Sequence, residues 1–466
     1  MDEGNVGSQL LARIKGLAKL WREVAGTTKS GELISLAPDL PDEDLGRLRA
    51  QMFACLEAKG GEVSARARAA ALGREYLSLN PVGRLRFLTL IAEEFGPDRD
   101  GVDAAVEALR AAQGEAGRAV AEAELRLALE PPRVRLLTQF NALPEGVKFL
   151  VDLRAELMSV MKGQPALQAL EADLKQLLTS WFDVGFLEMR RVTWRSPALI
   201  LEKIMAYEAV HAIQGWDDLK NRLDSDRRLY AFFHPRMPDE PLIFVEVALV
   251  KGIAGNIHEL LDRHAPLGDP EAADTAIFYS INNAQKGLNG ISFGNFLIKR
   301  VVEELSREFK RLKTFATLSP LPGFRPWLED RLSLGEPNLL SGPDHRALVA
   351  LSNGLGAKGS LKTLLADPNW TSDALLSEPL KAPLLRLAAR YLVQEKRGAD
   401  GRALDPVAHF HLSNGARVER LNWLADVSPK GMLQSCGVMV NYLYKLDEIE
   451  ANHETYAASG KVAVSG

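Results

Sequence analysis

The sequence is poor in cysteine, in charge of one sign and in long apolar runs, and each shortage excludes a class of protein. Only two cysteines occur among the 466 residues, Cys55 and Cys436, and their wide separation excludes a disulfide framework or a cysteine-ligated zinc site. The 57 Lys and Arg residues nearly balance the 61 Asp and Glu residues, so no basic excess points to nucleic acid. No apolar run approaches about 18 residues, so we expect no membrane-spanning helix.

The two ends of the chain lack recognisable targeting signals. The N-terminus has no charged start followed by an apolar core and a small-residue cleavage site, and Val464-Ser465-Gly466 is no peroxisomal signal. Together with the sparse cysteines, these features predict a protein of the reducing cytoplasm. The length of 466 residues exceeds what one hydrophobic core usually serves, so we expect two domains.

Residues 1 to about 185 are rich in Ala, Leu, Glu and Arg and are expected to form a helical bundle. An almost heptad pattern of apolar residues occurs at Leu167, Leu170, Leu174, Leu177 and Trp181. Proline pairs such as Pro131-Pro132 fall where helices should end. The apolar stripes could form only the core of this half, or they could extend to a subunit interface. A chemical role is not expected, because this half contains no histidine.

The second half, residues 186–466, changes in character because strand-like runs alternate with helical patterns. Strands are predicted at 229–233, 242–250, 275–279, 315–318, 407–412 and 438–444, and a helix at 295–312. This mixture predicts an α+β or α/β sheet domain. All eight histidines lie in this half, so we expect any chemistry here.

The run Val407–Leu412 is the most unusual of the predicted strands. Its alternation would place His409 and His411 on one face of a strand, with Phe410 and Leu412 on the other. Asn414-Gly415 would then close a hairpin turn. Two neighbouring histidines opposite an apolar face favour a polar cleft, although a strand histidine is more often structural than catalytic.

The segment 279–300 has the features of an anion-binding loop. It runs from a strand through a loop that contains Gly290 and Gly294 into an amphipathic helix whose opening turns carry Lys299 and Arg300. Glycines let backbone N–H groups approach a ligand, and a helix start adds positive partial charge. The spacing matches neither a Walker loop nor a dinucleotide fingerprint. The residues alone leave two interpretations open: a phosphate-binding loop, or a glycine-containing connection beside two solvated cations.

Three longer runs are more specific. They are Ala276–Ile281 continuing to Gly294–Val302, then Leu318–Phe324, and then Asp405–Gly415 with Asn422–Val427. Together and in this order they resemble the malonyl-CoA decarboxylases, over about residues 190–456. The resemblance implies a helical oligomerisation domain, residues 1–185, followed by a GCN5-related acetyltransferase-like mixed α/β catalytic domain, residues 186–466. It also implies conversion of malonyl-CoA to acetyl-CoA and CO2 by a homo-oligomer, a dimer or a tetramer, without a metal or an organic cofactor.

The resemblance also assigns site residues. Ser319 and His411 match the family's catalytic serine and histidine, and Ser280 and Tyr444 fall at positions associated with the malonyl pocket. Asn289, Gly290, Ile291, Ser292, Phe293, Gly294 and Asn295 match the family's CoA-binding loop. Lys299 and Arg300 are added to the expected CoA site because they lie in the opening turns of the following helix. The chain departs from the pattern at Ser292, where relatives often have glutamate, so the role of that carboxylate is in doubt here. It also lacks the interface cysteines of some relatives, so redox-controlled assembly is not implied.

These residues suit decarboxylation of a malonyl thioester, because this reaction needs one group that binds the carboxylate and one that gives a proton to the α-carbon. In this interpretation Ser319 hydrogen-bonds the malonyl carboxylate, and His411 orients the serine and supplies the proton. By sequence alone, Ser319 could be a turn residue before Pro320, and Tyr444 and Ser280 could serve ordinary strand packing. Two other functions remain open: a CoA-dependent acyltransferase, and a non-enzymatic acyl-CoA sensor.

Overall fold

The computed structural model describes residues 16–26, 36–57, 61–291, 296–337, 339–346, 348, 361–367, 369–398 and 401–465. The chain forms two compact units. The first consists of Met1–Glu188, Phe233–Leu242 and Asn283–Ser292, and the second of Met189–Phe232, Ile243–Asn282 and Phe293–Gly466. No helix among the described residues is long and apolar enough to cross a membrane.

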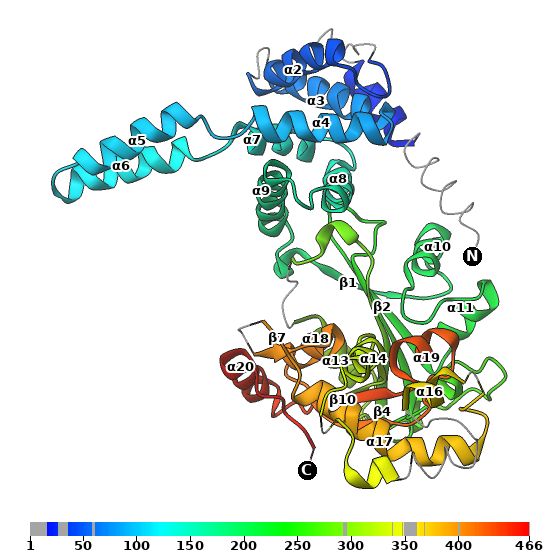
Figure 1. The fold of residues 1–466 in the computed structure, drawn as a ribbon. Helices are drawn as coiled ribbons and strands as arrows, with labels where there is room; N and C mark the ends of the chain where they lie inside the picture. The colour runs from blue at the N-terminus through cyan, green and yellow to red at the C-terminus, as the bar shows by residue number, and fades with distance from the viewer. Residues whose placement is uncertain are drawn as a thin grey trace. The chain divides into compact units, whose positions relative to one another are not determined.

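The first unit is helical in the part of residues 36–188 that the structure describes, apart from the first residue of β1. Its α-helices are α2 (Asp42–Leu56), α3 (Gly61–Ser78), α4 (Pro81–Glu94), α5 (Arg99–Ala111), α6 (Gly114–Ala128), α7 (Pro132–Gln139), α8 (Gly146–Val160) and α9 (Pro165–Trp181). Aromatic rings fill the core, where Phe149 contacts Trp21, Tyr76 and Phe140. The helices α5 and α6 form a hairpin that extends away from the other helices of this unit (Figure 1), and α5 buries none of its side chains. The expected helical N-terminal half is confirmed.

The second unit is built on a mixed sheet of eight strands. These are β1 (Glu188–Val192), β2 (Arg227–Phe233), β3 (Ile243–Val250), β4 (Thr275–Asn283), β5 (Thr314–Thr317), β6 (Ser319–Pro320), β9 (Arg417–Asn422) and β10 (Met439–Leu443). Their order is β1-β2-β3-β4-β5-β10-β6, with β9 also paired to β10. β4 and β5 run parallel, whereas β10 is antiparallel to β5, β6 and β9. The predicted fold class, helices followed by a mixed sheet domain, is therefore confirmed.

Helices surround this sheet in the second unit (Figure 1). They are α10 (Ala198–Tyr207), α11 (Trp216–Arg222), α12 (Ile257–Leu260), α13 (Phe296–Glu308), α14 (Phe324–Ser333), α16 (Leu361–Ala366), α17 (Ala374–Val393), α18 (Pro406–Ser413), α19 (Pro429–Ser435) and α20 (Ile449–Ser459). A short two-stranded sheet joins β7 (Lys396–Arg397) to β8 (Arg402–Ala403). The sheet core includes Ile277, Tyr279, Ala316, Leu318 and Met439.

The strands β4 and β5 part at a defined point. Phe278 and Thr317 are their last paired residues, and the N–H of Leu318 still donates to the carbonyl of Phe278 at 3.0 Å. Beyond this point β4 continues, whereas Ser319 pairs with Val440 of β10. The alternation of a strand places the side chain of Ser280 on the same face of β4 as Phe278. Polar side chains on β4 and at the start of β6 thus lie just beyond the point where the parallel ladder stops.

The apolar runs at 229–233, 242–250, 275–279, 315–318 and 438–444 correspond to β2, β3, β4, β5 and β10, so these predictions are confirmed. The predicted strand at 407–412 is wrong, because Pro406–Ser413 is the helix α18. Asp405 caps this helix, its Oδ1 accepting from the N–H groups of Val407 and Ala408 at 2.9 Å each. Pro406 has the φ angle that a first helical turn requires, and Gly415 follows the helix with a φ of 79°.

Candidate active site

The helix α18 separates the two histidines that a strand would have placed on one face. Residues two apart in a helix point in directions that differ by about 200°. Accordingly, His409 Nδ1 lies 3.0 Å from the hydroxyl of Tyr456, on α20, whereas His411 faces the sheet. Only His411 therefore reaches the strand ends where β4 and β5 part.

His411 is hydrogen-bonded through both ring nitrogens. Its Nε2 lies 3.1 Å from Ser319 Oγ, and its Nδ1 lies 2.8 Å from the hydroxyl of Tyr444. Ser319 begins β6, and Tyr444 follows the end of β10, where its N–H donates to the carbonyl of Phe315 at 2.8 Å. The structure thus brings together three residues from separate elements, and all three were predicted to belong to the site.

The cluster is buried and holds the histidine ring firmly. His411, Ser319 and Tyr444 are 2%, 5% and 3% exposed, and the ring of Tyr442 stacks on His411 with centroids 4.5 Å apart. Burial lowers the pKa of His411 to about 3 and raises the pKa of Tyr444 well above its usual value. The imidazole is therefore neutral at physiological pH, with one nitrogen that donates and one that accepts.

A second layer of hydrogen bonds fixes Ser319. Its hydroxyl donates to Thr317 Oγ1 at 2.9 Å, and the backbone N–H of Tyr442 donates to the same oxygen at 3.1 Å. The side-chain amide of Asn441 donates to the carbonyl of Thr317 at 2.7 Å. These contacts tie the end of β5 to β10, so the backbone that carries Ser319 is held by hydrogen bonds to the carbonyl and the hydroxyl of Thr317.

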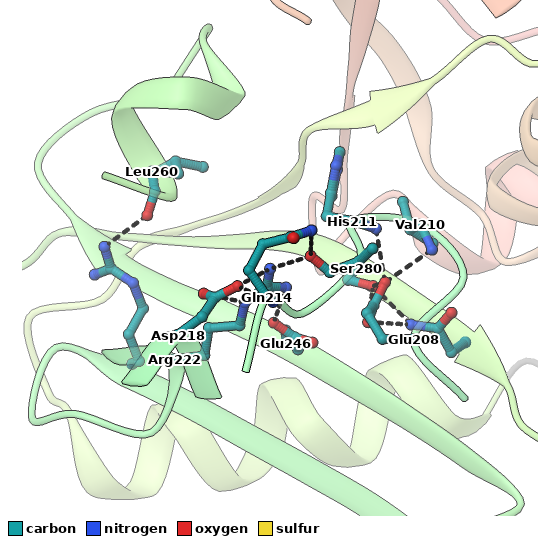
Figure 2. Close-up of polar contacts among 12 residues, drawn as sticks. Glu208, Val210, His211, Gln214, Asp218, Arg222, Glu246, Leu260 and Ser280 are labelled. Carbon is teal, nitrogen blue, oxygen red and sulfur yellow. Dashed lines mark hydrogen bonds and ion pairs between the residues drawn. The ribbon is translucent and has the colours of Figure 1, made fainter. Parts of the chain in front are cut away.

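Ser280 is engaged by a neighbouring set of polar residues (Figure 2). Its hydroxyl donates to the carboxylate of Glu208, at 2.8 Å from Oε2 and 3.0 Å from Oε1, and accepts from Asn282 Nδ2 at 2.7 Å. Sequence reasoning did not identify Glu208, which follows α10 in a segment without a motif. The contact joins residues 72 positions apart, so no local pattern could have revealed it.

A second buried carboxyl, that of Glu246 on β3, lies in the same region (Figure 2). Burial and the nearby charge of Glu208 raise the pKa of Glu246 to about 8, although Arg222 opposes the shift. The Arg222 guanidinium lies 3.2 Å from Glu246 Oε2 and 3.0 Å from Asp218 Oδ1. Glu246 therefore holds its proton more tightly than an exposed glutamate does.

The predicted CoA loop is described only in part. Asn289, Gly290 and Ile291 are described, but Ser292, Phe293, Gly294 and Asn295 lie outside the described residues. Gly290 has a φ of 75°, a conformation that favours glycine. The N–H groups of Asn289 and Ile291 donate to carbonyls of Lys286 and Leu288, so these two amides are already used within the loop.

The predicted cations Lys299 and Arg300 lie near the start of α13, within the second unit. Lys299 is exposed, whereas Arg300 is half-buried and its guanidinium lies 6.0 Å from the ring centre of Phe232. Arg300 also lines a hollow of about 400 Å³ together with Tyr230 and Glu304. Of the two, Lys299 has the more accessible charge.

Family models and curated proteins both relate this chain to the malonyl-CoA decarboxylases. The model of the malonyl-CoA decarboxylase C-terminal domain matches residues 185–466, and that of the malonyl-CoA decarboxylase N-terminal domain matches residues 95–182. The mitochondrial malonyl-CoA decarboxylase of Mus musculus is 41% identical over 398 residues, which cover 82% of this chain and 80% of that protein. The mitochondrial enzyme of Anser anser anser is 38% identical over 414 residues, 85% of this chain and 82% of that protein.

Solved crystal structures of malonyl-CoA decarboxylases also resemble this chain. The crystal structure of malonyl-CoA decarboxylase from Rhodopseudomonas palustris superposes with a TM-score of 0.82 at 46% identity, over 91% of this chain and 98% of that chain. The corresponding structure from Agrobacterium vitis gives a TM-score of 0.81 at 43% identity, over 90% of this chain and 98% of that chain. At this identity, the likeness extends beyond the fold to the family.

Proposed function

Because the chain belongs to the malonyl-CoA decarboxylase family and is thus a carboxy-lyase, we propose that Ser319 and His411 act together on the malonyl group of malonyl-CoA. The reaction releases CO2 and leaves acetyl-CoA. The observation that carries the proposal is the 3.1 Å contact between Ser319 Oγ and His411 Nε2 in a buried site. The proposal uses no metal ion and no organic cofactor.

The hydrogen bonds of His411 support one direction of donation through the cluster. The hydroxyl of Tyr444 donates to Nδ1, so that Nε2 carries the ring proton and donates to Ser319 Oγ. The serine hydroxyl is then free to turn from Thr317 to the malonyl carboxylate. A neutral imidazole is required for this arrangement, and burial keeps it neutral.

The chemical step breaks the bond between the α-carbon and the carboxylate. The electron pair of that bond moves onto the α-carbon and the thioester oxygen as an enolate, and neutral CO2 departs. The α-carbon then takes the proton from His411 Nε2, and the proton of Tyr444 moves to Nδ1. After the product leaves, water returns a proton to Nε2 and the Nδ1 proton goes back to Tyr444, which restores the starting state. Burial of the cluster favours the first step, because a desolvated carboxylate is less stable than the same group in water.

We also propose that the segment from Asn289 to Arg300 binds the phosphates of CoA. The left-handed backbone at Gly290 and the accessible charge of Lys299 support this assignment. A positive charge near the start of α13 suits an anion, because the helix start adds partial positive charge of its own. The expected cytoplasmic location of the protein stays a prediction.

The test is an assay of the purified protein with malonyl-CoA in which CO2 and thioester products are followed together. We expect equal amounts of CO2 and acetyl-CoA without any added acceptor. An acyltransferase would need an amine acceptor and would transfer the acyl group, and an acyl-CoA sensor would bind without turnover. Either of these results would contradict the proposed function.

A further inference from the structure

Glu208 is a buried carboxylate that no step of the proposed reaction uses. It is 6% exposed, and its Oε1 accepts from the backbone N–H groups of Val210 and His211 at 2.8 Å each. Its Oε2 accepts from Asn282 Nδ2 at 2.6 Å and from the hydroxyl of Ser280 at 2.8 Å. Donors at both oxygens are the pattern of an ionised carboxylate, which can only accept.

The charge of Glu208 has no cation bonded to it among the described residues. The nearby Arg222 pairs with Asp218 and Glu246 (Figure 2). Lys430 donates to the carbonyls of Ala209 and Val210. His211 lies next to the carboxylate, and burial lowers the pKa of its imidazole to about 4. At neutral pH this ring therefore carries no positive charge that could balance Glu208. Glu208 is therefore a negative charge that is hydrogen-bonded but not neutralised by direct contact.

The carboxylate determines what Ser280 can offer to a substrate. The hydroxyl proton of Ser280 points at Glu208, and its oxygen accepts from Asn282. Such a serine has no second proton with which to hold an anion, because a hydroxyl has only one. Ser280 therefore presents only the lone pairs of its oxygen to a substrate, and the negative charge of Glu208 lies next to that oxygen.

Ser280 lies close to the proposed reaction centre along the sheet. The last parallel pair joins Phe278 to Thr317. Ser280 follows two residues later on β4, and Ser319 begins β6 two residues after Thr317. The ring of Phe278 contacts that of Tyr444, with centroids 6.5 Å apart. A malonyl carboxylate held by Ser319 would therefore approach the part of β4 that carries Ser280.

We propose that Glu208, acting through Ser280, is a positioning residue that disfavours the bound malonyl carboxylate and so promotes its loss as CO2. The inference rests on the proposed function of Ser319. Two like charges repel strongly where water is excluded. The repulsion is relieved when the carboxylate becomes neutral CO2 and the charge moves to the thioester oxygen. An interaction that is less favourable in the ground state than in the transition state raises kcat.

If Glu208 had only a structural role, its replacement would change kcat and KM in a different pattern. In that case the carboxylate only attaches the turn after α10 to β4, and its loss would loosen the site. Loosening lowers kcat and weakens substrate binding together. Loss of electrostatic repulsion lowers kcat but tightens the binding of malonyl-CoA, which carries the extra carboxylate, relative to acetyl-CoA.

The test is the Glu208→Gln variant, which keeps the size of the side chain and removes its charge. We expect kcat to fall about 10-fold or more, the KM for malonyl-CoA to fall severalfold, and the inhibition constant of acetyl-CoA to stay unchanged. Glu208→Asp, which retains the charge, should keep the KM of the native protein. A fall in kcat with an unchanged or higher KM would overturn the inference, as would an unchanged kcat.

Glu246→Gln is the matched control. This neighbouring buried carboxyl has a pKa that is raised by burial and by the charge of Glu208, so Glu246→Gln removes an ionisable group from the same region and should change kcat and KM much less than Glu208→Gln does. Should Glu208→Gln not fold, Ser280→Ala decides the question. The inference predicts a KM for malonyl-CoA no higher than native, whereas a serine that donates to the malonyl carboxylate would show a raised KM. Full activity of Ser319→Ala and His411→Asn, measured in parallel, would instead refute the proposed function.

Discussion

The Nδ1 atom of His411 lies 2.8 Å from the hydroxyl oxygen of Tyr444, on the opposite side of the ring from Ser319. The tyrosine holds the orientation of the imidazole, and in the proposed direction of donation it also determines which nitrogen carries the ring proton. It comes from the end of β10, so the sheet rather than a flexible loop holds the histidine in place. This contact makes Tyr444 part of the proposed proton path.

Removal of this hydroxyl should lower activity without unfolding the protein. For Tyr444→Phe we expect a 10- to 100-fold fall in kcat, because a lost buried hydrogen-bond partner costs about 1–3 kcal/mol. The affinity for CoA should not change. Steady-state kinetics with malonyl-CoA measures the effect, and Tyr456→Phe, which removes one hydrogen-bond partner of His409, is the control with a much smaller expected loss. Equal losses in both variants would contradict the role of Tyr444.

The charge state of His411 gives a prediction about pH. Burial lowers the pKa of the folded protein's His411 from 6.5 to about 3, so the ring should stay neutral between pH 8 and pH 5. NMR of the imidazole resonances, assigned by comparison with His411→Asn, should show no titration of His411 in this range. A midpoint near pH 6.5 would contradict the proposed direction of donation.

The lowered pKa of His411 also makes the free energy of unfolding depend on pH. Between pH 6.5 and about 3 the unfolded chain binds a proton at His411 that the folded chain does not bind. The free energy of unfolding should therefore fall as the pH decreases below 6.5, and His411→Asn should remove that contribution. Denaturant unfolding at pH 7.5 and pH 5 compares the two proteins. The same loss of stability on acidification in both would show that His411 is not the source.

The CoA segment can be tested through one glycine and one lysine. Gly290→Val should weaken CoA binding strongly, because its φ of 75° strains a branched side chain. Lys299→Ala should weaken binding less and flatten its dependence on salt, because screened attraction is lost. Lys310→Ala, at an exposed lysine beyond the end of α13, is the control. Unchanged CoA affinity in Gly290→Val would refute the phosphate-loop assignment.

The expected assembly through the helical unit also stays a prediction. On α6 and just after it, Val120, Leu127 and Leu129 are 60%, 71% and 51% exposed, which suits contact with a second copy of the chain. The double change Val120→Glu and Leu127→Glu should dissociate the oligomer while kcat is retained. Analytical ultracentrifugation measures the change in mass. A native protein that is already a monomer at micromolar concentration would contradict the prediction.

Much of the fold could be predicted because the apolar runs of β2 to β5 and the helical pattern of α13 are local signals. The histidine segment was mistaken for a strand because its apolar residues alternate. The Asp405-Pro406 start and the Asn414-Gly415 end were the helix signals that should have prevailed. The alternation placed two histidines together, whereas the helix separates them.

The site was predictable only in part. Ser319 and His411 are 92 residues apart, and only the resemblance to a family linked them before the fold was known. Glu208 has no such link, because its partners Ser280 and Asn282 are brought to it by the pairing of the sheet with the segment after α10. A buried carboxylate is recognised from its hydrogen bonds, which a sequence does not show.

The measurement that tests the central claim most directly is the turnover of malonyl-CoA by His411→Asn compared with His409→Asn. The account predicts that His411→Asn and Ser319→Ala each lower kcat by ~10²–10⁴-fold, the range for a positioned proton-transfer group. Their double variant should be far less than multiplicatively worse, because the two groups share one step. His409→Asn should cost much less, since that ring faces Tyr456. Near-native kcat in His411→Asn, with or without loss in His409→Asn, would contradict the account.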